Sequence, residues 1–307
     1  MKKPLTTILI LSYILSFSQI IKEEINLTNN KISIPGTLSY SKIDKKQPLV
    51  IFIHGSGNID RNGNQKGTPI QINYIKALAD SLNNQSIAFY RYDKRTSIPQ
   101  NLDQLKDITI DDFVQDAKVV IHYFKSDDRF SGIHLIGHSQ GSLVAMLAAK
   151  NDVKSYISMA GAGETFDKIV VQQISAQNPE LGNIAKDHFI ELMEKDSIAA
   201  VNPMLQAIFA PQNRSFVKHW VAINPEKEIK KLNIPILILN GDADTQVTVS
   251  NAEKLKTACS KAKLEIIPKM NHLMKEVNSL TENQQAYIDA KYPISPKMLE
   301  TLIEFIK

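Results

Sequence analysis

The stretch LIGHSQGSL, residues 135–143, decides the fold and raises the question of chemistry. Ser139 stands between Gly137 and Gly141, after a strand-like apolar run and before a helix-like run of small residues. This strand-turn-helix setting is typical of a nucleophile elbow, in which a strained turn exposes a serine hydroxyl. A serine that only begins a helix would leave both glycines unexplained, whereas a strained turn needs residues without side chains.

Around this stretch, apolar strand-like runs alternate with amphipathic helix-like runs, the pattern of a mostly parallel sheet with helices on both faces. The predicted strands are 48–57, 86–95, 132–139, 155–163, 234–244 and 263–268, and the predicted helices are 71–82, 109–126, 140–150, 250–260 and 295–305. Residues 23–40 differ, because two alternating segments meet at Asn29-Asn30. We therefore expect an N-terminal antiparallel hairpin.

Residues 164–225 interrupt the alternation. They contain no strand-like run, while 166–177, 184–195 and 201–210 have helical periodicity. An all-helical stretch between two strands of one sheet predicts an insertion over the carboxyl ends of the strands. We expect a core of residues 19–163 and 226–307 and a helical cap insertion at 164–225.

The N-terminal residues predict export. Residues 1–18 combine two lysines, an apolar run and small residues near the expected cut, as in a secretory signal peptide. We therefore expect a secreted or periplasmic protein without a stable membrane span after signal removal. Loss of Lys2 and Lys3 lowers the formal net charge from +4 to +2, and the absence of a dense basic run argues against nucleic acid. With one cysteine, Cys259, an internal disulfide is excluded.

A serine nucleophile needs a base and an orienting carboxylate. Asp242 and Asp244 lie just past the apolar run PILILN (235–240), and His272 follows the last strand, 28 residues after Asp244. The order serine, acid, histidine is the one expected for a nucleophile elbow. Since ligands bind at the carboxyl ends of parallel strands, Ser139, His272 and one of these aspartates are the predicted catalytic residues.

The tetrahedral intermediate would also need donors for its negative oxygen. The residue after the nucleophile, Gln140, supplies one backbone N–H, and a loop after an early strand supplies another. The glycine-rich loop HGSG, residues 54–57, predicts Ser56 as that second donor. His138 adjoins the serine, but its place in the elbow directs it away from the hydroxyl.

Six motifs spread over nearly the whole chain after residue 18 resemble one family. They are HGSGNIDRNG (54–63), YRYDKR (90–95), LIGHSQGSLVA (135–145), AGAG (160–163), NPEKEIKKLNIPILILNGDADTQV (224–247) and PKMNH (268–272). Together they resemble secreted bacterial serine hydrolases of the esterase and dienelactone-hydrolase-like group of the α/β-hydrolases. In that group the acid is the fourth residue of a GxxDxxV pattern, which Gly241, Asp244 and Val247 match, so the resemblance favours Asp244 over Asp242.

The resemblance implies hydrolysis of short-chain carboxylic esters through an acyl-enzyme, without a metal or organic cofactor and with a small ester or acyl molecule as partner. It departs from dienelactone hydrolases, whose nucleophile is a cysteine. A serine peptidase or aminopeptidase and an acyl thioesterase remain alternatives because all use the same kind of intermediate. A non-catalytic binding protein is a further alternative, and the oligomeric state is left open.

Two sets of side chains around the predicted site have two interpretations each, and a third set belongs to the peptidase alternative. The loop charges, which could shape the pocket or form structural ion pairs, are Asp60, Arg61, Asp93 and Arg95. The apolar cap residues, which could line the pocket or pack the cap, are Phe166, Ile169, Met204, Phe209 and Trp220. The carboxylates that a peptidase could use to hold a peptide terminus are Glu164, Glu191 and Glu194.

Overall fold

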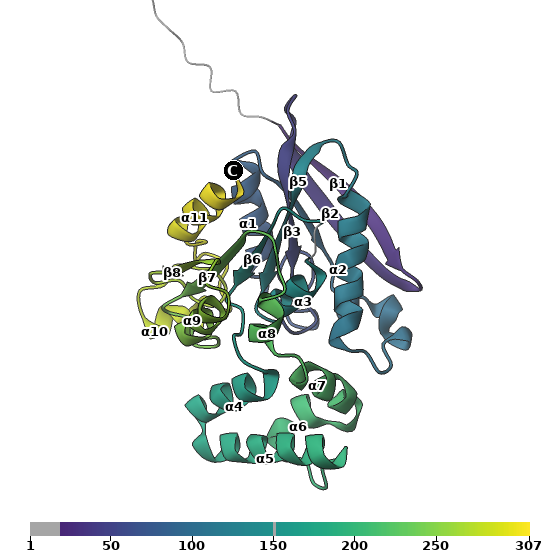
Figure 1. The fold of residues 1–307 in the computed structure, drawn as a ribbon, viewed down its shortest axis with the longest axis vertical. Helices are drawn as coiled ribbons and strands as arrows, with labels where there is room; N and C mark the ends of the chain where they lie inside the picture. Colours follow the sequence, from purple (N-terminus) through teal and green to yellow (C-terminus); the bar gives the residue numbers. More distant parts are fainter. Residues whose placement is uncertain (1–18, 150–151) are drawn as a thin grey trace, which may run out of the picture.

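The computed structural model describes residues 19–149 and 152–307. The predicted signal peptide, residues 1–18, lies outside the described residues. The described strands form one sheet in the order β1-β2-β4-β3-β5-β6-β7-β8 (Figure 1). Their bounds are β1 Ile20–Asn29, β2 Ile32–Ser41, β3 Gln47–Ile53, β4 Ala88–Tyr92, β5 Phe130–His138, β6 Ser155–Met159, β7 Ile236–Gly241 and β8 Lys263–Ile267.

The sheet is mostly parallel with an antiparallel N-terminal edge. β2 runs antiparallel to both β1 and β4, and every pair from β4-β3 to β7-β8 is parallel. The hairpin turn falls at Asn30 and Lys31, one residue later than predicted, and Asn30 takes the left-handed conformation with φ 55°. Asparagine tolerates that conformation better than most residues do.

Helices cover both faces of the sheet. On one face α1 and α11 pack on the sheet, and on the other face α2, α3, α8 and α9 do (Figure 1). The helix bounds in the core are α1 Tyr74–Asn83, α2 Ile110–Phe124, α3 Gln140–Ala148, α8 Pro225–Ile229, α9 Val249–Ala258, α10 Leu280–Gln285 and α11 Pro296–Ile306. Two 3₁₀ turns follow β4, η1 Arg95–Ser97 and η2 Pro99–Gln104. This architecture confirms the predicted α/β-hydrolase fold.

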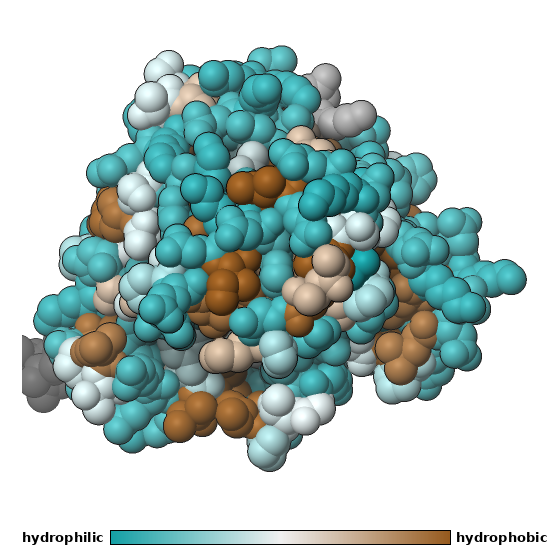
Figure 2. All heavy atoms as spheres, turned by 90° about the horizontal axis from the view of Figure 1, so that it is seen from below, coloured by the Kyte–Doolittle hydropathy of each residue, from teal (hydrophilic) through white to brown (hydrophobic). Residues whose placement is uncertain are grey.

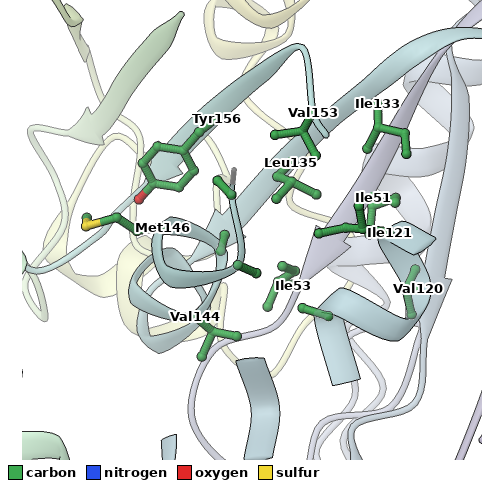
Figure 3. Packing of buried hydrophobic residues seen from close by; sticks show 14 of the residues in the cluster. Ile51, Ile53, Val120, Ile121, Ile133, Leu135, Val144, Met146, Val153 and Tyr156 are labelled. Carbon is green, nitrogen blue, oxygen red and sulfur yellow. The ribbon is translucent and has the colours of Figure 1, made fainter. Parts of the chain in front are cut away.

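Buried aliphatic side chains hold α2 and α3 against the middle of the sheet (Figure 3). Ile51 and Leu135 of the central strands are fully buried, and Val120 of α2 and Val144 of α3 pack in the same cluster. Each fully buried side chain of this size contributes about 1.5–3 kcal/mol. The start of α3, where the site lies, is therefore held rigidly on the sheet.

Helices α4 to α7 lie between β6 and β7, where the cap was predicted (Figure 1). Their bounds, with those of the short 3₁₀ turns, are α4 Phe166–Gln177, α5 Pro179–Lys195, η3 Pro203–Leu205, α6 Gln206–Phe209, η4 Pro211–Asn213 and α7 Arg214–Val221. They enclose a hydrophobic cluster of their own that includes Phe189, Leu192 and Phe209. Viewed from the cap side, the surface is mainly hydrophilic with separate hydrophobic patches (Figure 2).

Two cap segments differ from the expectation. α5 begins at Pro179, five residues early, because the Asn178 side chain accepts from Leu181 N and Pro179 suits the first helical position. The predicted helix 201–210 is divided into η3 and α6, since Asn202 caps a new turn at Met204 N. Helices α7, α8 and α10 were not predicted.

None of the helices in the described ranges is long and apolar enough to span a bilayer.

Candidate active site

Ser139 directly follows the carboxyl end of β5 and precedes α3. Its backbone has φ 54° and ψ −121°, outside the ordinary regions for a residue with a side chain. Such a conformation costs roughly 1–3 kcal/mol and persists only where the surroundings enforce it. The turn is fixed by a hydrogen bond from Ser139 N to Met159 O at 3.0 Å and one from Ser142 N to Ser139 O at 2.9 Å.

The two glycines of the motif allow the close crossing that enforces this turn. A Cβ atom on Gly141 would overlap the carbonyl oxygens of Ile53 and His54 at the end of β3, and one on Gly137 would overlap Gly141 O. Backbone atoms cannot move aside as a flexible side chain can. Both glycines therefore follow from packing around the partly buried serine, as the sequence motif predicts.

Asp244 and His272 form a buried hydrogen-bonded pair at the same edge of the sheet. His272 Nδ1 donates to Asp244 Oδ2 at 2.8 Å, and the Asp244 side chain is fully buried. The other carboxylate oxygen, Oδ1, accepts from Gln246 N at 2.8 Å and Val247 N at 2.9 Å. With its proton on Nδ1, the His272 ring presents an unprotonated Nε2. The alternative acid, Asp242, instead accepts from Lys269 N at 2.6 Å.

His138 connects the serine turn to the histidine loop. Its Nε2 donates to His272 O at 2.8 Å, and the two rings lie 4.9 Å apart between centroids. Its Nδ1 is then an acceptor, which Tyr74 Oη approaches at 3.4 Å. Burial lowers the pKa of His138 to about 3, so the ring is neutral at pH 7. Within residues 19–149 and 152–307, no hydrogen bond joins Ser139 Oγ to His272; such bonds are often long before substrate binds.

The two predicted oxyanion donors lie beside the serine. Ser56 and Gln140 line the same cavity as Ser139, and a Cβ on Gly55 would be 3.2 Å from Ser139 Cβ. Lys94, which was not predicted as a site residue, donates from its buried amine to Gly55 O and to the Gln140 side chain. Its place two residues after β4, among the carboxyl ends of the strands, was the one available signal.

The cavity at Ser139 has a volume of about 70 Å³ and is roofed by the cap. Phe166, Ile169 and Trp220 line it, and the Phe166 and Trp220 rings stack at 3.7 Å between centroids with 12° between their planes. The other two apolar cap candidates do not line it. Phe209 is buried in the cap's own cluster, and Met204 is 73% exposed.

One of the three cap carboxylates reaches the cavity. Glu164 lines it, but its carboxylate is held by Lys254 Nζ at 2.7 Å and Gln172 Nε2 at 2.7 Å. Glu191 is bonded within the cap, to Ala199 N, and Glu194 lies on the outer groove between α4 and α5.

The charged loop residues form ion pairs away from the cavity. Arg61 bonds Asp93 at 2.8 Å and Glu24 at 2.5 Å, and Arg95 bonds Asp112 at 2.8 Å and Asp116 at 2.7 Å. Asp60 accepts backbone N–H groups of its own loop. These contacts support the structural reading of the four residues. Across the described part of the chain, no three His, Cys, Asp or Glu side chains converge as a metal site.

Comparison with known proteins places the chain in a family. Residues 67–277 match the model of the family described as Serine aminopeptidase, S33. The chain belongs to this family. Membership supports the α/β-hydrolase superfamily predicted from the motifs, and the narrower likeness to dienelactone hydrolases stays a prediction.

Individual relatives are more distant. The chain is 24% identical to "Esterase EstD" of Thermotoga maritima over 260 residues, which covers 82% of this chain and 60% of EstD. It is 24% identical to "Probable aminopeptidase YbaC" of Bacillus subtilis over 203 residues, covering 66% of this chain and 56% of YbaC. The chain thus spans less than two thirds of both curated relatives. Est1E from Butyrivibrio proteoclasticus shares the fold with a TM-score of 0.57 at 20% identity, covering 92% of this chain and 98% of Est1E.

Proposed function

We propose that this protein is a serine hydrolase that cleaves carboxylic esters with short acyl chains. The observation that carries the proposal is Ser139, held in a strained turn at the wall of a small cavity. The hydrogen-bonded Asp244 and His272 at the same sheet edge supply the expected base and its orienting carboxylate. The family match and the esterase among the relatives support the same reaction class.

The roles follow from the protons. His272 Nε2 takes the proton of Ser139 as Oγ attacks the ester carbonyl, and Asp244 stabilises the resulting imidazolium. The backbone N–H groups of Ser56 and Gln140 donate to the developing oxyanion. His272 then protonates the leaving alcohol, and a water molecule, activated by His272 in the same way, releases the acid from the acyl-enzyme.

The cavity supports a short acyl chain. Its volume of about 70 Å³ is about half of the roughly 150 Å³ that an engineered benzene-binding cavity provides. The stacked rings of Phe166 and Trp220 line it on the cap side. An acetyl or similarly short group fits this space better than a long acyl chain does.

Labelling with a fluorophosphonate probe, followed by hydrolysis of p-nitrophenyl esters of increasing acyl length, tests the proposal. We expect the wild type to be labelled and to prefer the shortest esters, and Ser139→Ala to lose both reactions, with kcat reduced on the order of 10⁶-fold. An unlabelled, correctly folded wild type overturns the hydrolase proposal.

An aminopeptidase is the second candidate, favoured by the family description and by the carboxylate of Glu164 at the cavity. A substrate amine would have to displace Lys254 from Glu164, which disfavours this candidate. Comparing p-nitrophenyl acetate with an aminoacyl p-nitroanilide separates the two. If the anilide reacts faster and Glu164→Gln abolishes that preference, the aminopeptidase assignment replaces the esterase.

We also propose that the protein is exported, because residues 1–18 resemble a signal peptide. N-terminal sequencing of the exported protein tests this proposal.

A further inference from the structure

The buried amine of Lys94 contacts both segments that carry the predicted oxyanion donors. Lys94 is 5% exposed, and its Nζ donates to Gly55 O at 2.7 Å and to Gln140 Oε1 at 2.7 Å. In the described part of the chain, no carboxylate pairs with this amine. Burial lowers the pKa of Lys94 to about 7. A buried amine without a counter-ion destabilises the fold. A functional role therefore explains the presence of Lys94 better than a contribution to stability does.

The first contact acts on the donor at residue 56. Gly55 O and Ser56 N belong to one planar peptide group, so a bond that fixes the carbonyl also fixes the direction of the Ser56 N–H. Donation by the amine to the carbonyl polarises the peptide and makes its N–H a stronger donor. Lys94 therefore acts on Ser56 from the side opposite to the substrate.

The second contact holds the other donor. Gln140 is the first residue of α3 and lines the cavity, and its side chain accepts from Lys94, which leaves its backbone N–H free of this contact. Ser56 follows β3 and Gln140 follows β5, so the two donors come from separate strands. The amine is a single group that sets the spacing between them.

The end of β4 is itself anchored to the donor loop, which makes Lys94 a firm support. Lys94 N donates to Ile59 O at 3.2 Å, and His54 Nε2 donates to Tyr92 O. The Phe113 ring lies 4.8 Å from Nζ and holds the amine in place from the α2 side. Neither end of the bridge can move far without breaking these contacts.

We propose that Lys94 is a positioning residue of the oxyanion hole, which fixes and polarises the Gly55–Ser56 peptide and ties it to Gln140. The proposal rests on the proposed esterase function. Its consequence is confined to steps in which negative charge develops on the substrate oxygen. Binding of the uncharged ester is expected to depend little on Lys94.

The test replaces Lys94 by Met, which keeps the length of the side chain, and by Gln, which keeps a neutral donor. We expect Lys94→Met to lower kcat for p-nitrophenyl acetate about 10- to 100-fold with KM within threefold, and Lys94→Gln to lose less. Affinity for a trifluoromethyl ketone, whose serine adduct carries the oxyanion, should fall by the same factor as kcat. A kcat and a ketone affinity within threefold of wild type in folded Lys94→Met overturn the proposal.

Val120→Ala, a core change in α2, is the control for lost stability. It should keep the wild-type kcat even where its Tm falls as much as that of Lys94→Met. If Lys94→Met does not fold, Gln140→Met decides, because it removes one acceptor and keeps the backbone N–H. We expect it to weaken ketone binding three- to tenfold without changing KM, and unchanged ketone binding overturns the proposal. Where Lys94→Met folds, the double variant with Lys94→Met and Gln140→Met should lose no more ketone affinity than Lys94→Met alone. Additive losses contradict the proposed link from Lys94 to Gln140. A wild type inert to ester and fluorophosphonate refutes the proposed function instead.

Discussion

Replacement of Asp244 by Asn is the sharpest test of the roles assigned at the site. The amide is nearly isosteric with the carboxylate, but only one of its two polar atoms is an acceptor. Gln246 N and Val247 N both donate to Oδ1, at 2.8 and 2.9 Å, so the amide oxygen must occupy that position. The amide nitrogen then faces His272 Nδ1, where the carboxylate oxygen Oδ2 was.

This arrangement reverses the tautomer of His272. An NH₂ group facing Nδ1 requires an unprotonated Nδ1, so the proton moves to Nε2, and Nε2 can no longer accept the proton of Ser139. The same exchange at a serine triad lowers kcat by about 10⁴, which corresponds to about 5 kcal/mol of activation free energy. We expect a loss of this size with KM changed by less than about threefold.

The assay is steady-state hydrolysis of p-nitrophenyl acetate near pH 7.5, with thermal unfolding to confirm the fold. Asp242→Asn is the matched control, since Asp242 bonds Lys269 N and not His272. We expect this control to retain at least a third of wild-type kcat. A loss smaller than tenfold in Asp244→Asn, or an equal loss in the two variants, refutes the assigned roles.

Three further predictions concern packing, selectivity and pH. Gly141→Ala forces a Cβ against two backbone carbonyls and should cost about 2 kcal/mol or more of unfolding free energy in denaturant titration, and a loss below about 1 kcal/mol contradicts this. Trp220→Ala should raise kcat/KM for hexanoate relative to acetate esters about tenfold, and an equal change in the exposed-site variant Met204→Ala would count against it. Burial lowers the pKa of His134 from 6.5 to about 4, so the unfolded state binds more protons between these pH values and acidification from pH 6.5 to 4 destabilises the fold. His134→Gln should therefore reduce the dependence of unfolding free energy on pH in this range by up to about 1.4 kcal/mol per pH unit, with activity retained. An unchanged pH dependence contradicts the assignment.

Local patterns were sufficient where one short segment determines its own conformation. Gly137 and Gly141 specify the turn around Ser139 because a Cβ atom at either glycine collides with backbone. Asn30 marks the hairpin because its position requires a left-handed residue. The pairing of His272 with an aspartate after β7 was accessible because both follow strands of one parallel sheet, and the family resemblance then favoured Asp244 over Asp242.

Features that depend on contacts between distant segments were not accessible. An apolar cap residue looks the same in sequence whether it lines the cavity, as Trp220 does, or fills the cap cluster, as Phe209 does. In the sequence, Lys94 is one charged residue among several in YRYDKR. Its role becomes visible only when the structure places the loop at Gly55 and the start of α3 beside it. Helix α10 is only six residues long, too short for a periodic signal.

The stack of Phe166 on Trp220 joins the first and last helices of the insertion, α4 and α7, and the insertion fills its own interior. Its entry and exit are therefore tied together close to the sheet, and α5 and α6 can accumulate substitutions without altering the strands below. Such an arrangement suits evolutionary divergence of substrate selectivity. Exchange of one cap for another changes which molecules enter the cavity, while the catalytic side chains on the sheet stay in place.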